Sequence, residues 1–267
     1  MNHSHQPSED SVPDRRQTCH VERSYRIEHG SLVAIGGVKR RYDPLGEPAV
    51  VGEIAKLHEG DETRLLQFAR TWGQIGWPLA GEDLEPPIRG EPLSWIWDHA
   101  RNVRLALQLY DYLQSGDING LHQFLESYLA RLQPDAREAL LVPITGRLGT
   151  EPYPSVDRGE PERMAEDIIA AILNYNLPEV SYQVDAGPLD LRLHSPSLLG
   201  AVYWHLAGAV TKRNRLGRCQ DPTCKALFVA TDSRQRYCPP PSWSKHRTGS
   251  LCGARDRKRR LRQKKGG

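Results

Sequence analysis

Long apolar runs are missing from this chain of 267 residues. The longest nearly unbroken one, residues 198–210, covers thirteen positions and is interrupted by His205, whereas a membrane-spanning helix needs about 20. The first twenty residues, MNHSHQPSEDSVPDRRQTCH, have no apolar core that could serve as a secretory signal. We therefore expect a cytoplasmic protein with no membrane partner, in which residues 1–22 form a disordered leader.

Cysteine is also scarce, with five residues in the whole chain. In a reducing cytosol these cysteines are not expected to form structural disulfides. Four of them fall within the 34 residues of 219–252, and the fifth, Cys19, stands alone in the leader. Such clustering favours a shared metal over separate buried thiols or redox cysteines.

Recognisable catalytic signatures are absent as well. The sequence has no phosphate-loop pattern, no H-E-x-x-H and no G-x-S-x-G. Asp98 and His99 are adjacent, but neighbouring positions on a helix face different directions. His99 and His205 both lie in apolar stretches, which favours packed histidines over catalytic ones. We therefore predict no catalytic residues and no enzymatic activity, and keep an enzyme with its site in the helical body as an alternative.

Apolar periodicity predicts a mainly helical fold with minor β-structure. Helices are expected over about 61–72, from 92 or 94 to 115, over 119–132, over 161–176 and over 198–210, with Asp61 and Ser197 as N-terminal caps. Short strands are expected at 31–37 and in the pieces EVSYQV and LDLRLH. The predicted organisation is a helical N-terminal domain, 23–211, followed by a small C-terminal zinc-binding module, 212–267.

Charge is divided unevenly between these two parts. Residues 212–267 hold 17 basic and 3 acidic residues, a formal charge of +14, whereas residues 1–211 hold 19 basic and 30 acidic residues, giving −11. Such segregation predicts that the basic module meets a polyanion. A solvated solubility tail is the alternative interpretation of the same pattern.

The spacing of four cysteines predicts a structural zinc site. Four residues separate Cys219 from Cys224, thirteen separate Cys224 from Cys238, and thirteen separate Cys238 from Cys252. Four thiolates at about 2.3 Å form a closed tetrahedral zinc site, which is structural and not catalytic. His246 is the alternative to Cys252 as fourth ligand, because the stretch between the last two cysteines is long.

Local sequence predicts how the module folds around the metal. Asp221 and Pro222 favour a tight turn inside the first cysteine pair. The segment KALFVAT is expected to be a strand, and DSRQRYC to return the chain as its hairpin partner. Phe228 and Tyr237 are expected to cover the metal with apolar surface.

These features resemble those of a known family. C-x4-C, then Phe228, RQRYC and Cys252-Gly253-Ala254-Arg255 before a basic tail are similar to the bacterial CGNR zinc-finger proteins, over about 197–262. That family carries an N-terminal helical ABATE domain and is regarded as stress-induced transcription regulators. Two departures stand out: Ala254 replaces the signature asparagine, and residues 239–251, PPPSWSKHRTGSL, form an inserted loop.

Charge and resemblance together predict a transcription regulator that binds nucleic acid, with DNA favoured over RNA. The alternative is an RNA-binding or ribonucleoprotein-associated zinc protein in which Phe228, Tyr237 and Trp243 stack on bases. The helical body would sense a small-molecule signal or form a homodimer. The residues expected to contact nucleic acid are Arg234, Arg236, Lys245, Arg247, Arg255, Arg257, Lys258, Arg259, Arg260 and Arg262.

Overall fold

The first element that the structure describes is a long β-hairpin. The computed structural model describes residues 19–76, 90–131, 160–177, 180–184, 191–195, 197–211, 215–230, 232–244 and 250–265. Strands β1 (Cys19–Glu28) and β2 (Ser31–Tyr42) pair antiparallel around a turn at His29 and Gly30, and β3 (Glu91–Pro92) adds a third, short strand. The leader predicted for 1–22 therefore gives way to strand at Cys19, while residues 1–18 lie outside the described part.

Strand β2 is longer than the sequence predicted. The expected strand ended at Gly36 and Gly37, but β2 continues through both, with φ values of 88° and 77°. The pairing with β1 shifts register at Glu22, opposite this region. A β-bulge of this kind absorbs residues in the left-handed region without ending the ladder, which is why the glycines do not stop the strand.

Helices form most of the remaining body. They are η1 (Pro44–Gly46), α1 (Ala49–Ile54), α2 (Glu62–Trp72), α3 (Leu93–Ser115), α4 (Ile118–Arg131), α6 (Pro161–Asn176) and α7 (Leu198–Val210). Asp61 and Ser197 accept hydrogen bonds from the backbone N–H groups of Arg64 and Gly200, so both predicted caps are confirmed. Strands β4 (Ser181–Val184) and β5 (Leu191–His194) pair antiparallel, where two strands were predicted.

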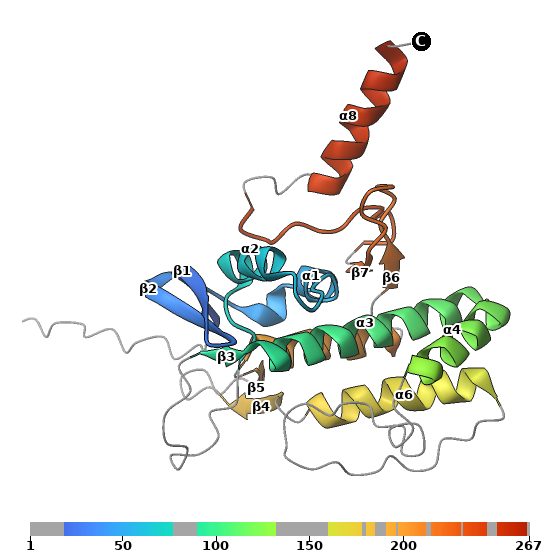
Figure 1. Cartoon of the computed structure of the whole chain (residues 1–267), viewed down its shortest axis with the longest axis horizontal. Helices are drawn as coiled ribbons and strands as arrows, with labels where there is room; N and C mark the ends of the chain where they lie inside the picture. Colours follow the sequence, from blue (N-terminus) through green and yellow to red (C-terminus); the bar gives the residue numbers. More distant parts are fainter. Residues whose placement is uncertain are drawn as a thin grey trace, which may run out of the picture.

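The long helix α3 organises the body. It packs against α6, α4 and α7, and on another side against α1 (Figure 1). Large side chains such as Trp72, Ile96 and Tyr203 are almost completely buried in the resulting core. The predicted class, mainly helical with minor β-structure, is confirmed for the described residues. None of the described helices has the length and apolar character needed to cross a membrane.

The cysteine-bearing segment begins with a small hairpin. Strands β6 (Arg215–Arg218) and β7 (Leu227–Ala230) pair antiparallel, and they contact α7 and α1 of the body. The prediction that DSRQRYC would pair with β7 is wrong: its described residues, 232–238, form turns and irregular structure. The edge of β7 is occupied by β6, which precedes it in sequence.

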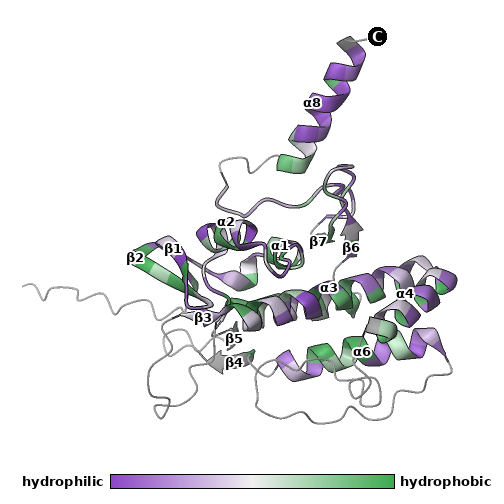
Figure 2. Ribbon diagram, in the orientation of Figure 1, coloured by the Kyte–Doolittle hydropathy of each residue, from purple (hydrophilic) through white to green (hydrophobic). Residues whose placement is uncertain are grey.

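The last element that the structure describes is the basic helix α8 (Leu251–Lys265). Ser250 caps this helix, because its hydroxyl accepts from the backbone N–H of Cys252 at 3.1 Å. Figure 1 shows α8 projecting away from the rest of the protein, and Figure 2 shows that most of it is hydrophilic. Leu251 and Leu261 are 68% and 60% exposed, so the few apolar side chains of α8 do not pack in the core.

Candidate metal centre

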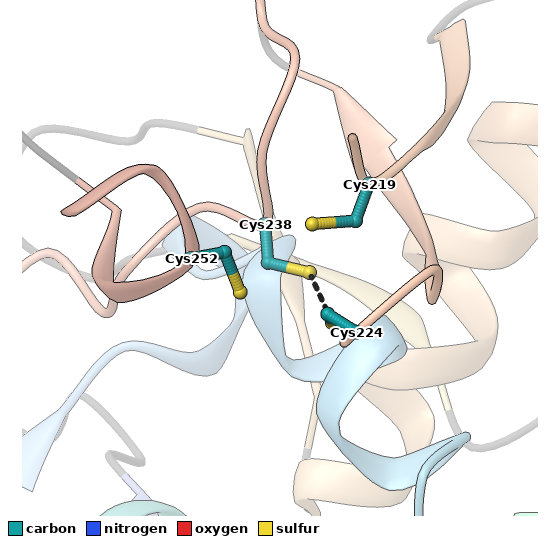
Figure 3. Close-up of side chains that lie close together, drawn as sticks. All are labelled: Cys219, Cys224, Cys238 and Cys252. Carbon is teal, nitrogen blue, oxygen red and sulfur yellow. Dashed lines mark hydrogen bonds between the residues drawn. The ribbon is translucent and has the colours of Figure 1, made fainter. Parts of the chain in front are cut away.

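Four cysteines converge from distant parts of the C-terminal segment. Cys219 follows β6, Cys224 lies in the turn before β7, Cys238 belongs to the irregular segment, and Cys252 lies in the first turn of α8 (Figure 3). Their sulfur atoms all lie within 4.8 Å of one another. Cys219, Cys238 and Cys252 are buried and Cys224 is partly exposed. This arrangement could hold a metal ion.

The spacing of the sulfur atoms fits coordination and not a disulfide. Cys224 Sγ and Cys238 Sγ are 3.7 Å apart, whereas a disulfide joins its sulfurs at about 2.05 Å. A tetrahedral ion with metal–sulfur bonds of about 2.3 Å separates its sulfurs by about 3.8 Å. The donor set and its geometry therefore match a closed four-thiolate site.

The turn that carries Cys224 is organised by Asp221. The backbone oxygen of Asp221 accepts from the N–H groups of Cys224 at 2.9 Å and Lys225 at 3.0 Å. Its carboxylate Oδ1 accepts from the backbone N–H and the hydroxyl of Thr223, at 3.1 Å and 2.9 Å. The predicted tight turn is thus present, and its aspartate fixes the position of the second cysteine.

Asp221 also ties this turn to α8. Its side chain is fully buried, and its Oδ2 accepts from Arg255 Nε at 3.0 Å. Arg255 Nη2 donates in addition to Cys252 Sγ at 3.2 Å. Burial raises the pKa of Asp221, but hydrogen bonds from Thr223 and Arg255 outweigh burial and hold that pKa below its usual value. A single arginine therefore links the first turn of α8 to the metal-binding turn.

A second carboxylate anchors the next turn of α8. Asp256 accepts from the hydroxyl of Tyr237 at 2.8 Å and pairs with Arg259 at 2.6 Å and Arg260 at 2.8 Å. Arg259 also lies 3.5 Å from Asp221. Three of the arginines predicted to contact nucleic acid, Arg255, Arg259 and Arg260, consequently form ion pairs within the protein.

Aromatic side chains close the site, as predicted. Phe228 is 1% exposed and packs with the buried cysteines, and Tyr237 packs against the same cluster. A Cβ atom at Gly253 would lie 3.2 Å from the ring of Tyr237. Glycine after the last cysteine therefore allows α8 to approach Tyr237 closely.

Electrostatics favour one thiolate in the cluster when no cation is present. A hydrogen bond from Cys238, with a contribution from the ammonium group of Lys56, lowers the pKa of Cys224 to about 5. Burial and the neighbouring sulfur of Cys224 raise the pKa of Cys252 to about 11. Crowded, buried thiols resist further ionisation, and a divalent cation is what would stabilise four thiolates together.

Residues 239–244, which follow the third cysteine of the cluster, contact the N-terminal part of the chain. Ser242 donates its backbone N–H to buried Glu47 at 3.0 Å. The ring of Trp243 lies 4.6 Å from that of Tyr42 and 5.1 Å from that of Trp72, and the guanidinium of Arg40 lies 4.7 Å from the Trp243 ring centre. Trp243 is thus half-buried against the body, and Phe228 is buried with no ring face free for stacking on a base.

The other predicted residues fall into two groups. Five are exposed: Arg234 and Arg236 on the irregular segment, and Arg257, Lys258 and Arg262 on α8. Lys245, Arg247 and the alternative ligand His246 lie outside the described residues.

In the body, His99 is buried with its Nδ1 2.8 Å from the Tyr203 hydroxyl, and burial lowers its pKa to about 3. His99 and His205, the two histidines predicted to be packed in the body, are both buried.

The sequence did not reveal the roles of Asp221, Asp256 and Lys56. Asp221 was interpreted only as a turn former, although an acid between two ligand cysteines could also accept an arginine. Asp256 is the only acidic residue of α8, four positions after Cys252, which was an available signal. Lys56 Nζ lies 3.7 Å from Cys238 Sγ across 182 positions, and no local pattern reports such a contact.

Comparison with known proteins leaves the site without a counterpart. No protein-family model matches the chain, and no match was found among curated proteins or solved structures. The resemblance to the CGNR proteins therefore rests on the quoted motif alone.

Proposed function

We propose that the four cysteines bind one structural zinc ion. Thiolate ligands select soft or borderline ions, and a closed set of four suits zinc without leaving a position for substrate. Cys219, Cys224, Cys238 and Cys252 would hold the ion, which would join the β6–β7 hairpin to α8. The zinc would have a structural role, because four thiolates would fill its coordination sphere and leave no position for water or substrate.

The chain offers a matched pair of variants to test this site. Metal analysis of purified protein should give one zinc per chain, and Cys224→Ser should abolish stoichiometric binding. Cys19→Ser is the control, because Cys19 lies in β1 and its sulfur is absent from the cluster. Zinc retained by Cys224→Ser to the same extent as by Cys19→Ser would contradict the assignment.

We further propose that α8 binds nucleic acid, with duplex DNA favoured, as in a bacterial transcription regulator. The observation that carries this proposal is the exposed set of Arg257, Lys258, Arg262 and Lys264 on a projecting helix (Figure 1). Within the described part of the chain these four side chains form no ion pair, in contrast to the arginines bound to Asp221 and Asp256. With fifteen residues, α8 is about 22 Å long, and the major groove of DNA admits a helix.

The metal centre supports this function by holding α8 in place. A highly charged helix with little apolar surface is a poor helix in isolation. Here Cys252 and the pairs to Asp221 and Asp256 fix its first turns. Arg257 and Lys258 lie between the paired residues, and Arg262 and Lys264 lie on the turn that follows. The helix would therefore already be ordered when it reaches phosphate groups.

Salt dependence distinguishes phosphate binding from a solubility tail. The variant Arg257→Gln/Lys258→Gln/Arg262→Gln removes three free cations and leaves the internal ion pairs intact. Its logarithmic salt slope for a mixed-sequence duplex should be smaller in magnitude by about 2.7, measured by fluorescence anisotropy between about 50 and 200 mM salt. Single-stranded DNA and structured RNA are measured in parallel to rank the partners.

A charge-matched variant provides the control. Arg23→Gln/Lys39→Gln/Arg70→Gln removes three exposed cations from β1, β2 and α2. This variant should keep the slope of the wild-type protein, because its changes lie outside the basic module. Equal effects of the two triple variants, or binding that does not respond to salt, would refute the role of α8.

A further inference from the structure

A second basic feature borders the turn that carries Cys224 and Lys225. It is a cavity of about 390 Å³ between the end of α1, the middle of α3 and the β6–β7 hairpin. This volume falls within the range of about 300 to 1,000 Å³ typical of small-molecule sites. The charged or titratable side chains that line it are Lys56, His58, Arg104, Asp111, Arg218 and Lys225.

The lining is cationic even though most of it belongs to an acidic part of the chain. Among the described residues that line it, Asp111 is the only one with a carboxylate, and it pairs with Arg218. Lys56 pairs with Glu53 at 2.5 Å. In the described residues, no carboxylate pairs with Arg104 or Lys225. Four of these six groups come from residues 1–211, and three of the four are basic. The formal charge of −11 describes residues 1–211 as a whole, so the positive lining is a local arrangement.

Arg104 is held rigidly at the wall of this cavity. Its Nε donates to the backbone oxygen of Ala55 at 2.9 Å, and its Nη2 donates to the oxygen of Leu57. These bonds fix the guanidinium at the C-terminal end of α1. Arginine has five N–H donors in a planar fork, so further donors remain for an anion. Burial lowers the pKa of His58, and the positive charge of Arg104 lowers it further.

Lys225 approaches from the opposite wall in an unusual conformation. Its φ is 48°, in the left-handed region that residues other than glycine seldom adopt. The hydrogen bond from its N–H to Asp221 holds it there, one position after Cys224. Backbone strain of this kind is concentrated at functional sites. Leu107, Tyr112 and Leu227 add apolar surface to the same cavity.

We propose that this cavity binds a phosphorylated small molecule of about mononucleotide size. Arg104 and Lys225 would contact the phosphate, and Tyr112 with Leu107 would contact the uncharged part. The ligand would touch both the helical body and the metal-bearing hairpin, because Cys224 and Lys56 line the cavity too. The phosphate group is the recognised chemistry, and a phosphodiester of a bound nucleic acid is its second possible source.

Calorimetry with full-length, metal-loaded protein tests this site. The probes are inorganic phosphate, ribose 5-phosphate, AMP and adenosine. AMP should bind at least about tenfold more tightly than adenosine, a difference of about 1.4 kcal/mol. Lys225→Gln should weaken AMP binding by a similar factor, and Arg70→Gln, an exposed site on α2, should leave it unchanged. His58→Gln is a second variant should Lys225→Gln lose its metal.

Duplex binding separates the two sources of phosphate and the two proposals. A small-molecule site predicts that Lys225→Gln leaves duplex affinity unchanged and that AMP does not displace the duplex. If both assays respond together, the phosphate belongs to the nucleic acid. The triple variant of α8 should retain AMP binding, so either site can fail alone. The cavity assignment is overturned if no phosphate probe binds at about 10 mM, if adenosine binds as tightly as AMP, or if Arg70→Gln weakens AMP binding equally.

Discussion

Asp221→Asn removes the charge on which the junction between the metal-binding turn and α8 depends. Asparagine can keep one oxygen for Thr223, but its amide N–H₂ would then face the N–H groups of Arg255. A hydrogen bond to a charged group contributes about 1.5 to 3 kcal/mol. Arg255 is 59% exposed while Asp221 is fully buried, so solvent screening places the loss near the lower end, about 1.5 to 2 kcal/mol.

This loss should appear as weaker metal binding. Cys252 can join the other three cysteines only when the first turn of α8 is docked, so the cost of undocking lowers the apparent affinity. At about 1.4 kcal/mol per factor of ten, Asp221→Asn should weaken zinc binding by about 10- to 30-fold. Competition with a chromophoric chelator measures this change directly, and near-ultraviolet circular dichroism reports the environment of Tyr237.

Asp232→Asn is the matched control for this experiment. Asp232 also lies between two cysteines of the cluster, Cys224 and Cys238, and its Oδ1 lies 3.6 Å from Arg234 Nε. The side chains of Asp232 and Arg234 are 53% and 90% exposed. Exposed pairs of this kind contribute little to stability. The control should therefore change zinc affinity by less than about twofold. If Asp232→Asn weakens zinc binding as much as Asp221→Asn does, the clamp between Asp221 and Arg255 is not what orders α8.

Three further outcomes follow from the body and its contacts. Trp243→Ala removes ring contacts to Tyr42 and Trp72, which should lower the free energy of unfolding by about 1 to 3 kcal/mol in urea titrations, and Trp243→Phe should recover part of it. Burial lowers the pKa of His99 to about 3, so the folded state excludes the proton that the unfolded chain binds below pH 6.5. Acidification from there should cost up to about 1.4 kcal/mol per pH unit through this residue, and His99→Gln should flatten that dependence. Chelation of the metal should disorder α8 while far-ultraviolet circular dichroism retains the signal of the other helices, because their core is separate from the cysteine cluster.

Elements with local signals were predicted well from the sequence. Asp61 and Ser197 mark helix starts that the structure reproduces, because capping depends on residues only a few positions apart. Helix α1 was missed, since six residues with an uncapped N-terminus give too short a pattern to detect. The partner of β7 was misassigned because residues 215–218 and residues 232–238 both lie close enough in sequence to form a hairpin with it, and the local pattern does not decide between them.

The sequence predicted the four cysteines of the candidate metal centre but not the contacts that surround them. Cysteine spacing alone placed four sulfurs together, since few other roles account for such clustering. The partners that Asp221 and Asp256 select could not be derived, because acidic residues among arginines have many possible neighbours. From sequence alone, every basic residue of the tail was expected to be available to a polyanion. In the structure, Arg255, Arg259 and Arg260 form ion pairs within the protein.

The docking of Trp243 has a consequence for how the chain folds as it is made. Trp72 and Tyr42 are synthesised about 170 and about 200 residues before the indole that packs against them. At about 5 to 20 residues per second, these intervals last roughly 10 to 40 s. Until residue 243 has been made, Tyr42 and Trp72 lack the ring that packs against them in the folded chain. We therefore expect chains truncated before residue 243 to aggregate more readily than the full chain, because they leave this aromatic surface exposed.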